Sequence, residues 1–176
     1  AAAIVVDRRE ELDGLSDEAI AAAAETAKAK GHEGKWLIEL INTTGQPALA
    51  SLKNRNLRKR IHLASIDRNT NGDTDNRPIV ARLAQLRTQK AQLLGYPNWA
   101  SYVMDDQMAK TPEAALELLT GLVPNAARNA KAEAAKLQAL ADKQGAGHPI
   151  EAWDWDFYSE LVRKVEHNLD EAAMKP

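Results

Sequence analysis

The chain has 176 residues with a formal net charge of -2, and 27% of its residues are charged. A chain of this length can bury one sizeable core, so we expect one domain. There is no overall positive charge of the kind that holds nucleic acid or an anionic membrane, and we expect neither as a partner. The absence of cysteine excludes disulfides, thiolate nucleophiles and thiolate metal ligands, and is consistent with a cytoplasmic protein.

We expect neither a membrane-spanning helix nor a signal peptide within these residues. Apolar runs are much shorter than the roughly 20 residues of a membrane-spanning helix, and the start, AAAIVVDRRE, lacks the basic residues that open a signal peptide. The chain begins without methionine and ends at Lys175-Pro176, just after the first residues of an amphipathic stretch, LDEAAM. We therefore expect a soluble segment cut from a longer polypeptide.

Residues 1–45 predict a strand, a helix and a second strand. The apolar stretches at 1–6 and 35–42 are typical of short strands. Between them, Ser16 is a good N-cap for an alanine-rich helix, and Gly31 fits the position that follows the C-cap. We expect a small hairpin-like strand pair that encloses a helix.

Residues 46–176 are predicted to be helical, so the fold class is mainly α. Apolar residues follow helical spacing over 79–94. A further helix is expected to begin with Thr111 as its cap and Pro112 at its first position, where the missing N–H of proline costs nothing. Pro124 is expected to break or kink that helix, because an internal proline loses a hydrogen bond and clashes with the preceding turn.

The stretch HEGKW, residues 32–36, is the nearest approach to a zinc motif. In His-Glu-x-x-His two imidazoles four residues apart bind one Zn²⁺. Here the fifth residue is Trp36, whose indole has no lone pair for a metal. We therefore interpret His32 as part of a surface connector. The other histidines are isolated from one another and favour surface or satisfied buried positions: His62, His148 and His167.

Residues 67–78, DRNTNGDTDNRP, resemble a calcium loop in their spacing. Oxygen-bearing residues and a glycine fall at positions 1, 3, 5, 6, 7 and 9 of an EF-hand loop: Asp67, Asn69, Asn71, Gly72, Asp73 and Asp75. Position 12 needs a bidentate glutamate, and Pro78 supplies no side-chain oxygen. We favour a polar interhelical loop in which Asp75 or Asn76 caps the next helix. A calcium-dependent helical regulator built on this loop remains an alternative hypothesis.

The basic run NRNLRKR, residues 54–60, has two interpretations. Its four cations could bind phosphate: Arg55, Arg58, Lys59 and Arg60. It lacks the interleaved aromatic residues that stack on bases, and the chain is slightly acidic overall. We therefore favour a solvated helix face.

The stretch AWDWDFY, residues 152–158, holds much of the aromatic content of the chain. It could line a groove for a peptide, because Trp and Tyr give a large contact area at a low entropy cost. We favour a helix N-terminus that Trp153 or Trp155 anchors and that Asp154 or Asp156 caps.

Several longer strings resemble one family. The sequence is similar to the thimet oligopeptidase family of zinc metallopeptidases, and within it to the bacterial peptidyl-dipeptidases. The resemblance covers nearly the whole chain in a consistent order, on these strings: ELDGLSDEAI (11–20), NTTGQPALASL (42–52), GDTDNRPIVARLAQLR (72–87), LLGYPNWASYVMDDQMAKTPEAA (93–115), AWDWDFYSELVRK (152–164) and LDEAAMKP (169–176). The stretch VEHNLDE departs from the pattern, because His167 and Asn168 stand where the family pattern leads us to expect an aromatic residue.

The resemblance implies a part of a larger enzyme. Family members are mainly helical, two-lobed bodies around a deep channel that admits short unfolded peptides. Their zinc site is a His-Glu-x-x-His helix plus a later glutamate, and by resemblance it lies downstream of this chain. No catalytic, cofactor-binding or metal residue is therefore carried over to residues 1–176. Zinc, peptide substrates and the remaining catalytic half of the polypeptide would belong to the parent protein.

Two functions follow from these observations. The first is an internal segment of a cytoplasmic peptidyl-dipeptidase, which would form scaffold and channel wall in the non-catalytic half and would be inactive alone. The second is a non-catalytic helical module that binds peptides. A segment of a larger protein is also expected to expose a large apolar surface or to self-associate.

Overall fold

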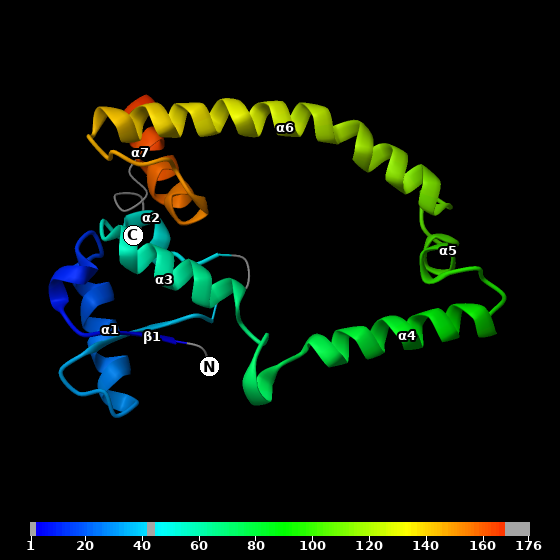
Figure 1. The fold of residues 1–176 in the computed structure, drawn as a ribbon, viewed down its shortest axis with the longest axis horizontal. Coiled ribbons are helices and arrows are strands. Elements are labelled where there is room, and N and C mark those ends of the chain that lie inside the picture. The colour runs from blue at the N-terminus through cyan, green and yellow to red at the C-terminus, as the bar shows by residue number, and fades with distance from the viewer. Residues whose placement is uncertain (1–2, 42–44, 168–176) are drawn as a thin grey trace. The chain divides into compact units, whose positions relative to one another are not determined.

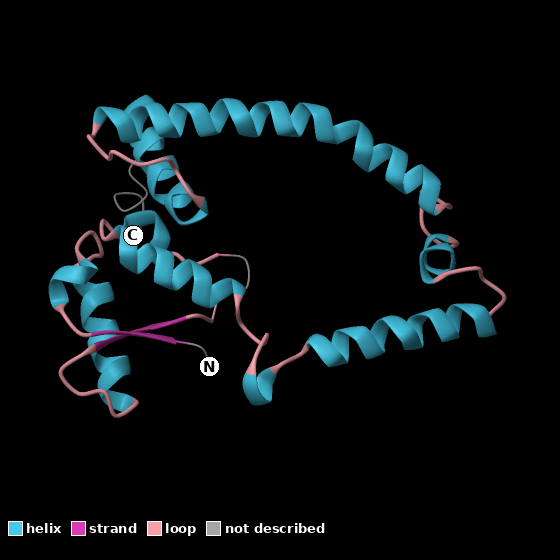
Figure 2. Ribbon diagram, viewed as in Figure 1, coloured by secondary structure: helices cyan, strands magenta, loops and turns pink. Residues whose placement is uncertain are grey.

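The computed structural model describes residues 3–41 and 45–167. Over these residues the chain is mainly helical, with seven α-helices and one antiparallel sheet of two strands (Figures 1 and 2). The predicted mainly α fold with a small strand pair near the N-terminus is confirmed. Within the described ranges, no helix combines the length and the apolar character needed to cross a bilayer.

The chain divides into two compact units. Unit 1 takes its residues from 1–68 and 133–176, and unit 2 comprises residues 69–132. Unit 1 is therefore discontinuous in the sequence, because the whole of unit 2 is inserted between its two parts.

Unit 1 begins with the predicted strand–helix–strand element. Two strands pair antiparallel, with Ile4 opposite Ile38, and the sheet shows as two magenta arrows in Figure 2. The bounds in order are β1 (Ala3–Val6), the 3-10 turn η1 (Arg9–Leu12), α1 (Asp17–Ala29) and β2 (Trp36–Glu39). The second strand is shorter than the 35–42 that the sequence suggests, and residue 42 lies outside the described residues.

Local signals fix both ends of α1. The hydroxyl of Ser16 accepts the backbone N–H of Ala19 at 3.2 Å, so the predicted N-cap is confirmed. At the other end Gly31 has φ +80°, and the N–H of His32 donates to the carbonyl of Ala27 at 2.8 Å. This backward bond after a left-handed glycine is the Schellman motif, which satisfies carbonyls that the helix end leaves open.

The rest of unit 1 packs helices on this element. Their bounds are α2 (Ala48–Ser51), α3 (Arg55–Ile66), the end of α6 (Pro112–Lys143), the 3-10 turn η3 (Ala152–Asp154) and α7 (Trp155–His167). One core cluster joins the sheet to α1, α2 and α3, and its buried members are Val6, Leu12, Ile20, Leu40, Leu49, Leu52, Leu57 and Ile61. A smaller cluster holds α7 against the end of α6 through Leu137, Ala141 and Tyr158.

Unit 2 is a succession of helices with very little interior. It contains the 3-10 turn η2 (Gly72–Thr74), α4 (Arg77–Leu93), α5 (Trp99–Met104) and the first part of α6. Thr111 caps α6 as predicted, since its hydroxyl accepts the N–H of Ala114 at 3.2 Å. Within residues 69–132 the one buried residue is Ala91.

Pro124 does not end the helix in which it lies. The helix α6 continues from Pro112 to Lys143 with Pro124 inside, so the prediction of a break is wrong. The ribbon curves in this yellow-green stretch of Figure 1, which fits the alternative prediction of a kink. A proline removes one hydrogen bond of the helix, and the turns on either side retain theirs.

Candidate functional site

The strongest polar constellation in unit 1 is a buried carboxylate held by two arginines. Asp154 is fully buried, and it accepts hydrogen bonds from Arg55 and Arg58, which lie one turn apart on α3. Arg55 donates Nε and Nη2 to Asp154 Oδ2 at 3.0 and 2.9 Å. Arg58 donates Nη2 to Oδ1 at 2.7 Å. We call these three residues the Asp154 clasp.

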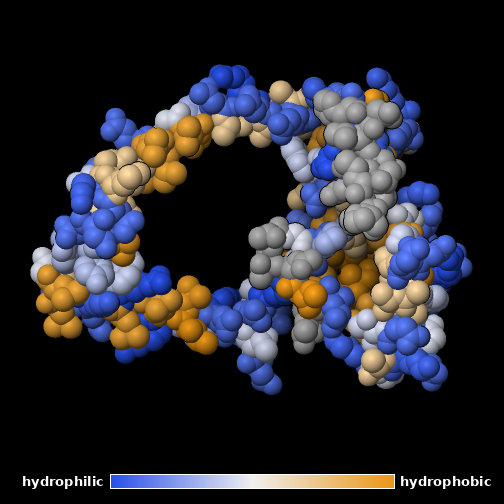
Figure 3. Space-filling model, turned by 180° about the vertical axis from the view of Figure 1, so that it is seen from behind, coloured by the Kyte–Doolittle hydropathy of each residue, from blue (hydrophilic) through white to orange (hydrophobic). Residues whose placement is uncertain are grey.

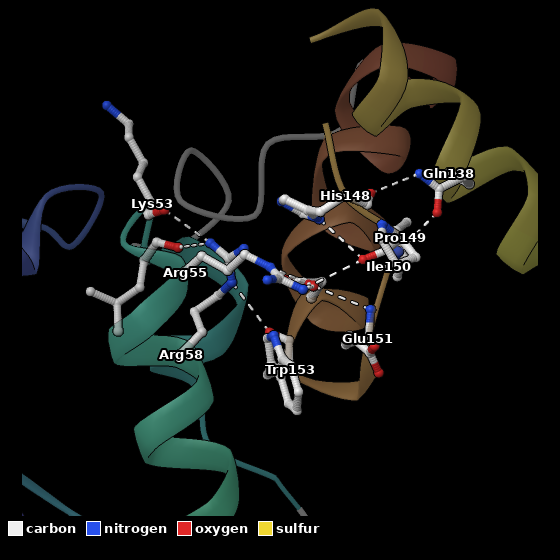
Figure 4. A network of polar contacts seen from close by, with 11 residues as sticks. Lys53, Arg55, Arg58, Gln138, His148, Pro149, Ile150, Glu151 and Trp153 are labelled. Carbon is white, nitrogen blue, oxygen red and sulfur yellow. Dashed lines mark hydrogen bonds and ion pairs between the residues drawn. The ribbon is translucent and has the colours of Figure 1, made fainter. Parts of the chain in front are cut away.

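Arg58 is the centre of the clasp, because its side chain is only 2% exposed. Its Nη1 donates to the carbonyls of Leu52 and Lys53 at 2.8 and 3.1 Å, and its Nε donates to the carbonyl of Trp153 at 3.2 Å. Figure 4 shows both guanidinium groups reaching from α3 toward the segment that contains Trp153. A buried guanidinium is tolerated because its donors are used in this way.

Aromatic rings cover the clasp. The guanidinium of Arg58 lies 4.3 Å from the ring centroid of Phe157, and the ammonium of Lys59 lies 4.8 Å from that of Trp153. His62 meets the edge of Trp153 at 6.2 Å between ring centroids. These contacts join α3 to η3 and the start of α7 through cation–π and edge contacts.

Two further contacts extend the network. Gln138 of α6 donates to the carbonyl of His148 at 3.1 Å and accepts the N–H of Ile150 at 2.8 Å. The N–H of Glu151 donates to Asp154 Oδ2 at 3.2 Å, as part of a capping box on η3. Asp154 thus takes part in capping as the third residue of this box, whose N-cap is Glu151, and not as the N-cap of α7. The same carboxylate also binds the arginines.

The electrostatics of Asp154 favour its charged form. Burial raises the pKa of the carboxyl, but the hydrogen bonds from Arg55, Arg58 and the Glu151 amide lower it by more, so the pKa lies below its ordinary value. An ionised carboxylate with three donors around it is a poor proton acceptor at neutral pH. The clasp therefore holds the fold together and does not provide an acid or base.

The favoured interpretation of residues 54–60 as a solvated helix face is wrong for Arg58 and incomplete for Arg55. Arg58 is buried, and the side chain of Arg55 is 32% exposed. Arg60 donates to the carbonyl of Val5 at 2.9 Å. The four cations of this run thus contact other parts of unit 1. Arg55, Arg58 and Arg60 form hydrogen bonds, and Lys59 lies over the ring of Trp153.

The metal candidates from the sequence do not converge. His32 is exposed and its backbone closes the Schellman motif, while Trp36, at the fifth position of HEGKW, begins β2. The Asp75 carboxylate binds Arg77 through the guanidinium at 2.8 Å and the backbone N–H at 3.0 Å. These bonds lower the pKa of Asp75.

Among residues 3–41 and 45–167, no three or more His, Asp or Glu side chains are placed to hold a metal ion. The donor set that zinc requires is thus not present in the described part of the chain. The side chain of His167 lies outside the described residues.

Unit 1 also contains a groove of about 1190 Å³. It is lined by residues of α1, β2, α2 and α7, mainly small or apolar ones such as Ala19, Ala22, Leu37, Ala48, Phe157 and Leu161. Charged side chains complete the lining, among them Glu18, Lys53, Glu160 and Lys164. An apolar trough with charged residues at its margin suits an amphipathic peptide.

The fold and the clasp define a helical scaffold without a complete catalytic centre in its described residues. Peptidase family M3 matches residues 48–176, and the chain belongs to this family.

Individual relatives match over nearly the full chain. It is 47% identical to the dipeptidyl carboxypeptidase of Escherichia coli over 98% of its length, and 47% identical to that of Salmonella typhimurium over 100%. It is 35% identical to a probable cytosolic oligopeptidase A of Arabidopsis thaliana over 98%. The chain spans 26% of the length of each of these relatives.

Proposed function

We propose that residues 1–176 are part of a cytoplasmic zinc metallopeptidase that removes dipeptides from the C-termini of short peptides. The observation that carries this proposal is the 47% identity to two dipeptidyl carboxypeptidases along the whole chain. Within that enzyme this segment belongs to the non-catalytic half and forms scaffold and channel wall. A channel wall selects peptides by size, because folded proteins cannot enter.

Two features of the structure support a scaffold role. The strongest polar cluster is a buried carboxylate whose two oxygens both accept hydrogen bonds from arginines. In the described residues no three or more His, Asp or Glu side chains are grouped to hold a metal ion. The zinc of such an enzyme would then be bound by the remaining catalytic half of the parent. Residues 1–176 alone are then expected to be inactive.

The test compares the full-length parent with residues 1–176. Each protein is incubated with an N-terminally blocked pentapeptide, products are identified by mass spectrometry, and bound metal is measured. The parent should contain zinc, release C-terminal dipeptides and lose this activity in a chelator. Residues 1–176 alone should contain no zinc and release no dipeptides. A pentapeptide with a C-terminal amide is the control, because a dipeptidyl carboxypeptidase needs a free carboxylate. A parent that cuts the amide equally well would contradict the proposed specificity.

The groove of unit 1 favours one alternative, a non-catalytic helical module that binds peptides. Its apolar lining and charged margin suit a short amphipathic peptide. The alternative predicts that residues 1–176 bind such peptides without cleaving them. A Leu161→Asp substitution, which puts a charge into the lining, should then weaken binding about 10-fold or more. Unchanged affinity would remove the groove from consideration.

A further inference from the structure

Unit 2 exposes apolar side chains in regular helical rows. On α4 the row consists of Ile79, Leu83, Leu86 and Leu93, whose exposed fractions lie between 45% and 87%. On α6 a second row consists of Leu116, Leu119 and Val123, with Leu118 and Leu122 beside it. Figure 3 shows orange, hydrophobic patches over the parts of the molecule where α4 and α6 lie. We call the two rows together the docking face.

The docking face is too regular to be a scatter of surface residues. Isolated exposed leucines are normal, but apolar residues at spacings of three and four on one helix share one side of it. The α6 row keeps this spacing, whereas the α4 row is interrupted by Lys90 between Leu86 and Leu93. Such a row normally faces a core. Unit 2 has no core to receive it, because Ala91 is its one buried residue within 69–132.

The charges of α4 indicate the chemistry of what covers it. This helix contains four basic residues and no Asp or Glu. Arg77 binds Asp75, and Arg87 and Lys90 lie over the ring of Trp99 at 5.4 and 5.7 Å. Arg82 donates to the neutral side chain of Gln85 at 3.3 Å. No ion pair to Arg82, Arg87 or Lys90 is present among the described residues. The exposed side of α4 is therefore apolar and positively charged, with Lys90 within the row.

We propose that the docking face binds an apolar segment with carboxylate side chains, supplied by the part of the parent polypeptide outside residues 1–176. This inference rests on the proposed function, in which the parent is a longer enzyme. The relatives are about four times as long as this chain. The parent therefore has enough further chain to cover both rows, and carboxylates on the covering segment would pair with the cations of α4.

Hydrogen exchange of the full-length parent tests the proposal. Amides of α4 should exchange about 100-fold more slowly in the parent than in residues 1–176, because a covered helix opens less often than an exposed one. The substitution Leu83→Asp in the parent should return α4 to fast exchange. Ala81→Asp is the matched control, since it puts the same charge on the opposite, exposed side of the same helix and should leave exchange slow.

Substitutions of Arg82 test the acidic character of the partner. If carboxylates lie opposite α4, Arg82→Glu in the parent should speed exchange of α4 more than Arg82→Gln does, because it adds repulsion to the loss of attraction. Equal effects of the two variants would overturn the acidic part of the proposal.

Two results would overturn the docking itself. One is exchange of α4 that is as fast in the parent as in residues 1–176. The other is a parent dimer that Leu83→Asp converts to monomer, which would make a second copy the occupant. Peptidase activity is measured separately on the unsubstituted parent. An inactive parent with a protected α4 would contradict the proposed function alone, and an active parent with an unprotected α4 would contradict the docking alone.

Discussion

Units 1 and 2 differ in how they use the apolar residues that the structure describes. Of the buried apolar residues, all except Ala91 belong to unit 1. Unit 2 instead holds most of the large apolar residues that are exposed. Isolated helices of this length are marginal in water, and packing of an apolar face supplies most of their stability. We infer that unit 1 is stable by itself and that unit 2 depends on contacts from elsewhere.

The Asp154 clasp explains how unit 1 can be discontinuous. Arg58 and Asp154 are separated by 96 positions in the chain, and all of unit 2 lies between them. The clasp joins the two parts of unit 1 beside a small core. We infer from this contact that unit 1 can hold its two parts together without support from unit 2.

The largest expected effect comes from removing the clasp. Asp154→Asn should lower the free energy of unfolding of residues 1–176 by about 4 kcal/mol, because it leaves two guanidinium groups without their carboxylate. The measurement is urea denaturation followed by tryptophan fluorescence. Asp156→Asn is the matched control, since Asp156 is exposed two residues further on, and it should cost less than about 1 kcal/mol. Equal losses for the two variants would show that the clasp does not hold unit 1 together.

A pair of leucine substitutions tests the difference between the units directly. Leu57→Ala in the core of unit 1, where Leu57 is fully buried, should cost about 3 kcal/mol. Leu86→Ala in unit 2, where Leu86 is 45% exposed, should change the stability of residues 1–176 by less than about 0.5 kcal/mol. Both are measured by urea denaturation. A large loss for Leu86→Ala would mean that unit 2 has a core of its own.

A somewhat smaller effect is expected where the backbone of unit 1 passes close to itself. A Cβ on Gly14 would lie 2.0 Å from the carbonyl oxygen of Ser51, and Gly14 has φ +99°. Gly14→Ala should therefore cost about 2 to 3 kcal/mol, as strain plus a clash. Gly34→Ala is the control, because Gly34 has φ +77° with nothing within 4 Å, and it should cost about 1 kcal/mol. Thermal unfolding measures both, and identical shifts would exclude the clash as a cause.

The features that could be predicted from sequence are those that depend on neighbours in the chain. Ser16 and Thr111 cap their helices through residues three positions away, and Gly31 ends α1 through a contact with the preceding turn. Such signals are visible in a short window. Mainly helical content and the strand pair follow from the same local patterns.

The clasp could not be predicted, because its partners are distant in the sequence. Arg55 and Arg58 lie one turn apart in a run that also fits a solvated face, and nothing local ties them to Asp154. The acid between two tryptophans was the one available signal, and it equally fits a cap, which Asp154 also provides. Whether α6 breaks or only kinks at Pro124 could not be decided from the sequence for a related reason, because the outcome depends on the helical turns on both sides of the proline.

The smallest expected effect is the pH dependence of the clasp. The folded-state pKa of Asp154 is lowered, so its contribution is complete above the unfolded-state pKa of about 3.9. This stabilisation is lost as the pH falls from the unfolded-state pKa through the folded-state pKa, at no more than about 1.4 kcal/mol per pH unit. The stability difference between the unsubstituted chain and Asp154→Asn should therefore be constant from pH 5 to 7, as an order-of-magnitude window, and should shrink below about pH 4.

Unit 2 supplies the matched case for this titration. The pKa of Asp75 is also lowered, by hydrogen bonds from Arg77, but the pair is exposed to solvent, where ion pairs contribute little. Denaturation of Asp75→Asn beside the unsubstituted chain should show no measurable difference that depends on pH. If Asp75 and Asp154 gave the same acid dependence, burial of the clasp would not be what separates the two units. If only Asp154 shows an acid dependence, a lowered pKa contributes to stability when the ion pair is buried and joins distant segments of the chain.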